Sequence, residues 1–326
     1  MTSLAEFNQA RSTTSLLITG LLYSGSSAVK DLLSEYSNIK QVPGEFDDFR
    51  LPGMVFDQVA DDPVTHDFSD KIPVYIRHFL RFKSFRPRHV AGALALRTGA
   101  LKNSVTKRLP ALKRLNKALA GSISREQKLG WVRKYLDELV SIYADENQFL
   151  LFDQPILWGR HLDVWPKVFA PFKMIVVYRN PLDQIADIVQ NNLLYRDLWG
   201  RFCESYGATE IYGYSRQGAL KFQIAAITAR MNHVEHAFGE IGANRMLMVC
   251  FDRLVVEPER QIRRIEAFLG DDQDAYHSVP GTAFLAHQSQ GNVGLYSSIL
   301  DPMDEELIQP LVQRYLLWEE KFGGAT

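Results

Sequence analysis

The amino-acid sequence predicts an α/β fold, with a central parallel sheet, helices on both of its faces and a helical insertion. Three observations lead to this expectation. Short apolar, β-branched runs alternate with segments of helical periodicity at the start of the chain and again from Gln148 onward. A loop rich in glycine and serine joins the first predicted strand to the first predicted helix. The chain has 326 residues, 46% of them hydrophobic, which is enough to bury a large core.

The first elements follow the order strand, loop, helix, strand. Residues 13–19 form an apolar, β-branched run that predicts a strand ending at Gly20. The following helix has an apolar stripe at helical spacing, made of Val29, Leu32, Leu33 and Tyr36. Residues 39–42 predict a second strand, which we expect Pro43 and Gly44 to end.

The same alternation returns in the second half of the chain. Apolar runs predict strands at residues 149–152, 174–178 and 246–250. Helical periodicity predicts helices at residues 158–169, from Pro181 onward, and at residues 220–238, 258–269 and 307–315. We therefore expect one domain over residues 1–326.

The middle of the chain, residues 50–147, predicts a helical, basic insertion within that domain. Its clearest helix carries an apolar stripe from Leu129 to Tyr143. Residues 71–125 contain 14 Lys or Arg and no Asp or Glu, so the rest of the chain has 23 basic and 38 acidic residues. Such a block fits an anionic partner, namely a saccharide or the surface of a lipid membrane, or it is a solvated helical face. We expect no nucleic-acid partner.

Composition excludes several classes of protein. No apolar run approaches the roughly 20 residues of a membrane-spanning helix, and residues 1–11 lack the apolar core of a signal peptide. Cys203 and Cys250 are too few for a disulfide framework or a zinc site, and we expect no metal. Cys250 ends an apolar run, which favours a buried position. These features predict a cytoplasmic protein.

The loop at residues 20–27 is typical of a phosphate-binding, P-loop-like site. Glycine lets backbone N–H groups turn toward an anion, and the start of the next helix adds further donors. The nucleotide kinase pattern is G-x-x-x-x-G-K-[ST], and Ser26 stands at its lysine position. This replacement disfavours ATP chemistry, in which the lysine reaches the phosphates. A glycine-serine turn that only caps a helix is the alternative.

A second anion-binding feature follows the strand predicted at residues 174–178. Arg179 comes directly after this strand, and Asn180-Pro181 opens a helix. A guanidinium beside a helix N-terminus favours a bound phosphate. An arginine paired with a carboxylate at the edge of the sheet would give the same pattern.

With both features, the chain resembles the sulfotransferases that use 3′-phosphoadenosine 5′-phosphosulfate (PAPS). Residues 20–27 look like the family's 5′-phosphosulfate loop, and YRNPLD at 178–183 looks like its 3′-phosphate motif. Residues 251–270, which contain FDRLV and end in FLG, are similar to the segment that follows in the family. Residues 291–294 loosely resemble its late glycine loop. The resemblance spans about residues 13–50 and 148–300.

The resemblance implies the fold, PAPS as co-substrate without a metal, and a set of binding residues. Those at the 5′ end are Tyr23, Ser24, Gly25, Ser26, Ser27 and Ala28, and those at the 3′-phosphate are Arg179 and Asp187. This chain departs from the family at two of these positions. Tyr23 stands where the family has Lys or Arg, so Tyr23 or Lys30 would replace that cation, and Asp187 stands where the family has Ser.

Transfer of a sulfuryl group requires a base for the proton of the acceptor. Glu45 follows the second strand and is the first candidate, as a related branch of the family has a glutamate near this place. Asp153, at the end of the next strand, is the second candidate. Tyr23 would act at the donor. The resulting prediction is a PAPS-dependent sulfotransferase. The alternatives are a non-catalytic protein that binds a nucleotide or polyanion, and a P-loop kinase.

Overall fold

The structure is a computed structural model that describes residues 13–50, 54–60, 100–144, 149–194, 215–270 and 284–323. The chain divides into two compact units. The first unit comprises Met1–Leu17, Ile39–Ile156 and His161–Phe172. The second comprises Ile18–Asn38, Leu157–Arg160 and Lys173–Thr326. The predicted single domain with an inserted segment at 50–147 stays a prediction.

Five strands form one sheet in the order β2-β3-β1-β4-β5. They are β1 (Thr14–Gly20), β2 (Ile39–Glu45), β3 (Phe149–Asp153), β4 (Phe172–Tyr178) and β5 (Met246–Cys250). β2 pairs with β3 in parallel, and β4 pairs with β5 in parallel through five residue pairs from Met174–Met246 to Tyr178–Cys250. The predicted α/β fold with a central parallel sheet is confirmed, and the strands lie at the five places where the sequence predicts them.

The prediction that Pro43-Gly44 ends the second strand is wrong. β2 continues through both residues to Glu45, with a shift of register between Gln41 and Glu45. β2 lies at the edge of the sheet. An edge strand tolerates proline because one side of the strand needs no ladder hydrogen bond, and the irregularity absorbs the left-handed φ of 81° at Gly44.

Helices of the first unit surround an aromatic core. They are α2 (Asp47–Arg50), α3 (Val55–Val59), α6 (Ala100–Leu119), α7 (Arg125–Tyr143) and α8 (Trp165–Phe169). Buried rings meet edge to face or tilted, with centroids 4.8–6.2 Å apart, among Phe46, Phe49, Phe56, Phe152 and Phe169. Such pairs add to the stabilisation that burial of the rings provides.

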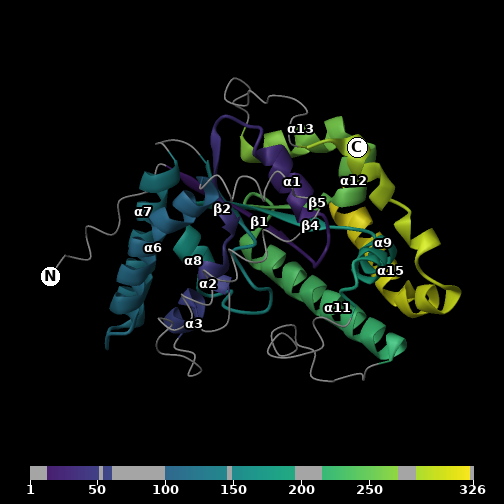
Figure 1. Ribbon diagram of the computed structural model, residues 1–326, viewed down its shortest axis with the longest axis horizontal. Helices are drawn as coiled ribbons and strands as arrows, with labels where there is room; N and C mark the ends of the chain where they lie inside the picture. Colours follow the sequence, from purple (N-terminus) through teal and green to yellow (C-terminus); the bar gives the residue numbers. More distant parts are fainter. Residues whose placement is uncertain are drawn as a thin grey trace. The chain divides into compact units, whose positions relative to one another are not determined.

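α6 and α7 lie side by side in the first unit (Figure 1). α7 begins with a capping box in which Ser124 and Gln127 exchange hydrogen bonds of 2.8 and 3.3 Å, and it buries Val132, Leu136 and Leu139 as its apolar stripe predicts. The helix predicted at 158–169 is mostly wrong, because α8 covers only its last turn. Gly159 and His161 have φ values of 88° and 58°, which a helix cannot contain.

The second unit contains the remaining described helices. They are α1 (Ser26–Leu33), α9 (Pro181–Gln190), α11 (Arg216–Ile241), α12 (Phe251–Val256), α13 (Pro258–Leu269), α14 (Ala286–Ser289) and α15 (Pro302–Phe322), with the 3₁₀ turns η4 (Gln290–Asn292) and η5 (Leu295–Ser298). α15 packs against both α9 and α11 (Figure 1). The helices predicted from Pro181, at 220–238, at 258–269 and at 307–315 are confirmed.

No described helix is both long and apolar enough to cross a lipid bilayer. Residues 71–99 of the predicted basic block lie outside the described residues. Its last part forms α6.

Candidate functional site: the β1–α1 loop and Arg179

The loop between β1 and α1 has an unusual backbone. Leu22, Tyr23 and Gly25 have φ values of 68°, 41° and 84°, all in the left-handed region. Residues with side chains rarely adopt this region, and they do so mainly where surrounding structure compels them and where function requires it. The loop at 20–27 is therefore a constrained turn with three backbone units rotated away from their usual orientation.

Two glycines make this turn possible. A Cβ atom on Gly25 would lie 2.2 Å from Cδ2 of Phe251, and one on Gly20 would lie 2.3 Å from Oγ of Ser24. Phe251 begins α12, so the glycine lets the loop approach an element more than 200 residues away in the sequence. The sequence shows glycine at both positions, but it does not show that the ring of Phe251 leaves no room for a side chain at Gly25.

Side chains from inside the unit hold the loop in this shape. Oγ of Ser24 accepts a hydrogen bond of 3.0 Å from the backbone N–H of Leu21. The buried amide of Gln184, on α9, donates to the carbonyl oxygens of both Leu21 and Leu22. No motif in the sequence indicates this role of Gln184. Only its place four residues into the helix that follows Arg179 could have indicated that it faces the loop.

The start of α1 offers the donors expected of an anion site. Gly25 occupies the N-cap position, and Ser26, Ser27 and Ala28 form the first turn. The first N–H groups of any helix lack partners within the helix and carry a partial positive charge. No acidic residue lies in this turn, so nothing there opposes an anion. Lys30 lies further along the helix and contacts Asp31 at 3.8 Å.

Arg179 lies in the same unit as the loop and contacts it. Its Nη1 atom is 3.5 Å from the carbonyl oxygen of Tyr23 and 3.2 Å from Oδ2 of Asp187. Its Nη2 atom donates to the carbonyl oxygen of Asn292, and its guanidinium lies 5.1 Å from the ring centroid of Phe251. Both sequence interpretations of Arg179 thus remain: it adjoins the candidate phosphate loop, and it pairs with a carboxylate.

The turn that carries Arg179 is itself fixed by hydrogen bonds. Oδ1 of Asn180 accepts from the N–H of Leu182 at 3.0 Å and caps α9, which has Pro181 at its first position. Oδ2 of Asp252 accepts from the N–H of Asn180 at 2.7 Å. Burial raises the pKa of the Asp252 carboxyl, although this hydrogen bond and the nearby charge of Arg179 oppose the shift.

Asp183 anchors the late glycine segment to α9. Its buried carboxylate accepts hydrogen bonds of 2.9 Å from the N–H of Gly294 and 3.0 Å from the N–H of Tyr296. Together with the bond from Arg179 to Asn292, these contacts hold residues 292–296 against the helix that follows Arg179. The sequence indicated this segment only by a loose resemblance, and the role of Asp183 was missed.

A polar network joins the ends of β4 and β5 to α15. The hydroxyl of Tyr178 donates to Glu319 of α15 at 2.5 Å, and Arg253 contacts the same carboxylate. Sγ of Cys250 lies 3.5 Å from the hydroxyl of Tyr315. Burial raises the pKa of the Cys250 thiol to about 12. Cys250 is buried as the sequence predicted, while Cys203 lies outside the described residues.

The two candidate bases lie together in the first unit. Glu45 and Asp153 are register partners at the carboxyl ends of β2 and β3, and the N–H of Phe46 donates to the carbonyl oxygen of Asp153 at 2.6 Å. Asp153 is buried. Glu45 is 42% exposed and forms an ion pair with Arg50. Of these two carboxylates, Glu45 is therefore the one that an acceptor could reach.

Comparison with known proteins gives a consistent result. The model of the sulfotransferase family matches residues 15–274. The fold is similar to a sulfotransferase domain from the Synechococcus PCC 7002 olefin synthase, with 15% identity, a TM-score of 0.52 and coverage of 95% of this chain and 96% of that one. A sulfotransferase domain from the curacin biosynthetic pathway has 13% identity and a TM-score of 0.44 over 93% of this chain and 98% of that one. The search of curated proteins gave no match.

The family model covers the β1–α1 loop, Arg179 and, apart from Thr14 of β1, the five strands of the sheet. The resemblance to sulfotransferases that the motifs indicated is confirmed at the level of the family. The chain belongs to the sulfotransferase family.

Proposed function

We propose that the chain transfers a sulfuryl group from PAPS to a hydroxyl or amine of an acceptor. The observation that carries this proposal is the contact between two anion-binding features within one unit. The constrained loop at residues 20–27 lies against Arg179, which follows β4, with Nη1 of Arg179 3.5 Å from the carbonyl of Tyr23. A donor with phosphate groups at two positions requires two such features.

The residues present fit the 5′ end of the donor. The first turn of α1 provides N–H donors, and Ser26 and Ser27 provide hydroxyl groups. A sulfuryl group carries less charge than a terminal phosphoryl group. Its loop can therefore rely on neutral donors in place of the lysine that kinases use. We propose Tyr23 as the residue nearest the reacting group.

The residues around Arg179 fit a 3′-phosphate in part. The guanidinium is buried, and within the described part of the chain its Nε atom has no acceptor. A buried donor without a partner is unfavourable, and an anion would satisfy it. Asp187, however, already contacts this guanidinium.

For the chemical step we propose Glu45 as the base and Asp153 as the second candidate. As the acceptor oxygen or nitrogen forms its bond to sulfur, the bond between sulfur and the oxygen of the 5′-phosphate breaks. The proton of the acceptor passes to the carboxylate, and adenosine 3′,5′-bisphosphate leaves. The ion pair with Arg50 holds the carboxylate of Glu45, which is 42% exposed, at the end of β2.

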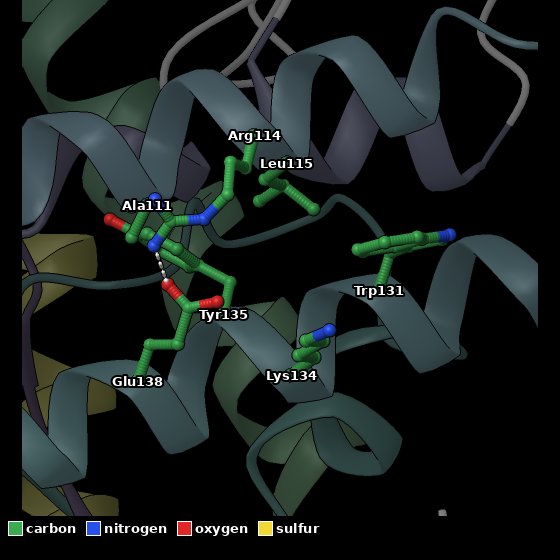
Figure 2. Close-up of a pocket in the computed structure, with 7 residues that line it drawn as sticks. All are labelled: Ala111, Arg114, Leu115, Trp131, Lys134, Tyr135 and Glu138. Atoms are coloured by element: carbon green, nitrogen blue, oxygen red, sulfur yellow. Dashed lines mark hydrogen bonds and ion pairs between the residues drawn. The ribbon is translucent and has the colours of Figure 1, made fainter. Parts of the chain in front are cut away.

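The basic face of α6 supports an anionic acceptor or an anionic surface as partner. Lys107, Lys113, Arg114 and Lys117 are exposed on one side of this helix, which contains no acidic residue. Arg114 pairs with Glu138 of α7 at 2.5 Å, and Nζ of Lys134 lies 5.0 Å from the ring centroid of Trp131 (Figure 2). Arg114, Trp131 and Lys134 line a cavity between α6 and α7 that is too small for a saccharide or a lipid headgroup, so the support for an anionic partner is the exposed positive charge of α6.

A non-catalytic role is the second candidate, because Tyr23 stands at the loop position of a cation that would stabilise charge on the leaving group. Such a protein would bind a nucleotide or a polyanion without transfer. The cytoplasmic location predicted from the sequence stays a prediction.

Turnover with PAPS tests the proposal. The purified chain, PAPS and a panel of alcohols, sugars and amines should yield adenosine 3′,5′-bisphosphate that depends on the acceptor. Glu45→Gln should lower kcat by at least about a hundredfold, as expected for loss of a general base. Glu259→Gln removes one charge from a loose, exposed ion pair of 3.9 Å and should leave kcat unchanged.

Binding separates the second candidate from the first. Both adenosine 3′,5′-bisphosphate and adenosine 5′-monophosphate should raise the melting temperature, the bisphosphate more, and Arg179→Ala should remove the difference. Binding without turnover would support the non-catalytic role. If neither nucleotide binds, the proposed donor site is refuted.

A further inference from the structure

The guanidinium of Arg179 already has an anionic partner inside the protein. Its Nη1 atom lies 3.2 Å from Oδ2 of Asp187. The side chain of Arg179 is 2% exposed, so water screens this pair weakly on the side of the arginine. Its other contacts are the carbonyl oxygens of Tyr23 and Asn292 and the ring of Phe251, none of which carries a net charge.

Asp187 is held in this position from its other side as well. Nδ2 of Asn191 donates to Oδ1 of Asp187 at 2.6 Å and to the backbone oxygen of Asp187 at 2.8 Å. One carboxylate oxygen thus faces Asn191 and the other faces Arg179. The side chain of Asp187 is 26% exposed, so it can turn into water when another anion approaches Arg179.

This arrangement has a direct consequence for a bound anion. A phosphate at Arg179 must either displace the carboxylate of Asp187 or remain beside it. Displacement loses a charge-assisted hydrogen bond, and two neighbouring anions in a poorly screened place repel each other. Either way, a phosphate gains less from Arg179 than it would gain if residue 187 were neutral.

We propose that Asp187 is a specificity-determining residue that occupies Arg179 and weakens the binding of 3′-phosphorylated nucleotides. Asn191 is a positioning residue that orients the carboxylate for this contact. This inference rests on the proposed function, because it assumes that the 3′-phosphate of the donor meets Arg179. It adds that the preference of the site for a 3′-phosphate is limited by the chain itself.

The experiment compares two nucleotides on matched variants. Dissociation constants for adenosine 3′,5′-bisphosphate and adenosine 5′-monophosphate are measured by isothermal titration calorimetry. Asp187→Asn keeps the shape of the side chain and removes its charge, and Asp187→Ser serves as a second variant if the first does not fold. Asn191→Ala releases the carboxylate, and Glu259→Gln controls for the change in net charge.

We expect Asp187→Asn to tighten binding of the bisphosphate by about tenfold. The phosphate then no longer has to replace the charge-assisted hydrogen bond between Arg179 and Asp187. The affinity for the monophosphate should stay unchanged, because this ligand has nothing to place at Arg179. Asn191→Ala should have the same effect with a smaller size, about threefold. Glu259→Gln should change neither constant.

The outcome depends on the preference for the bisphosphate, which is the dissociation constant of the monophosphate divided by that of the bisphosphate. Suppose that this ratio is the same in wild type, Asp187→Asn and Asp187→Ser, and that Arg179→Ala lowers it. The site then binds a 3′-phosphate, but Asp187 does not limit this binding, and the inference is wrong. A change of both constants by the same factor would show a general loss of charge and would also overturn it. If no variant binds either nucleotide, the proposed function and this inference fail together.

Discussion

Replacement of Gly25 by alanine tests the geometry of the β1–α1 loop most directly. Gly25 has a φ of 84°, and a Cβ atom there would lie 2.2 Å from Cδ2 and 2.6 Å from Cγ of Phe251. The left-handed backbone adds a penalty of about 1–2 kcal/mol for a residue with a side chain. Displacement of a packed ring adds about 1–3 kcal/mol. We therefore expect Gly25→Ala to lower the free energy of unfolding by about 3 kcal/mol.

Urea unfolding followed by tryptophan fluorescence measures this loss, and Gly239→Ala provides the control. Gly239 lies within α11, and a Cβ atom there would meet no other atom within 4 Å. Alanine is favoured over glycine in a helix by roughly 1 kcal/mol, so this variant should be somewhat more stable than wild type. The two glycine substitutions should thus have opposite signs.

The contribution of the ring can be separated with a double variant. In a Phe251→Ala background the clash is absent, and Gly25→Ala should then lower stability only by the backbone penalty of about 1–2 kcal/mol. An equal loss in both backgrounds would mean that Phe251 does not press on the loop. If Gly25→Ala is as stable as wild type, the left-handed turn itself is refuted.

Three further predictions concern buried charged and titratable groups. Arg108 and Asp48 form a buried ion pair of 3.4 Å, so Arg108→Met should lower the free energy of unfolding by about 3–5 kcal/mol in urea unfolding, because it leaves a buried carboxylate without its countercharge. Burial raises the pKa of Asp252 above the ordinary 3.8, so the folded state favours the protonated acid and loses stability as the pH rises through the shifted pKa. The stability of Asp252→Asn relative to wild type, measured by thermal unfolding, should therefore increase as the pH rises from 3.8 through the raised pKa. A stability difference that does not change with pH would contradict the shift. Because burial raises the pKa of Cys250 to about 12, a Cys203→Ser variant should react with iodoacetamide at pH 8 only after unfolding, which mass spectrometry would detect.

The sequence predicts most strands and helices of this fold because their local patterns agree with their tertiary environment. The run at 246–250 and the helix at 258–269 have the same bounds in the structure as in the prediction. The errors arise where position in the sheet or backbone conformation overrides pattern. Pro43 lies within β2 because that strand is at the edge, and residues 157–164 do not form a helix because Gly159 and His161 adopt left-handed φ values.

The candidate site was predicted in its motifs but not in its supporting contacts. The loop at 20–27 is marked in the sequence by its glycine and serine residues, and Arg179 is marked by its place directly after an apolar strand. Gln184 has no such mark, and Asp183 ends the YRNPLD motif without any indication of its partner, since each of the two acts on a segment more than 100 residues away that only the folded chain brings near. The pairing of Arg179 with Asp187 was open in the sequence, where an arginine after a strand fits a phosphate and a carboxylate equally well.

The two ends of the proposed donor site differ in what a ligand must displace. At the 5′ end, Gln184 holds the carbonyl oxygens of Leu21 and Leu22, and the first turn of α1 presents N–H donors with no acidic side chain beside them. At Arg179 a ligand has to replace Asp187. The loop should therefore determine whether an anion binds, and the ion pair should determine which nucleotide is preferred.

Gln184→Ala distinguishes these two roles. Loss of its two hydrogen bonds frees the loop, so a ligand must order it on binding, and we expect the affinities for adenosine 3′,5′-bisphosphate and 5′-monophosphate to fall by the same factor, about tenfold. Calorimetry on both nucleotides measures this factor. A change in their ratio would mean that Gln184 also acts on the 3′ side, through the turn of α9 that connects it to Asp187. If the ratio is unchanged in Gln184→Ala and shifts only in Asp187→Asn, then α9 acts on the 5′ end of the site through Gln184 and on the 3′ end through Asp187, independently of each other.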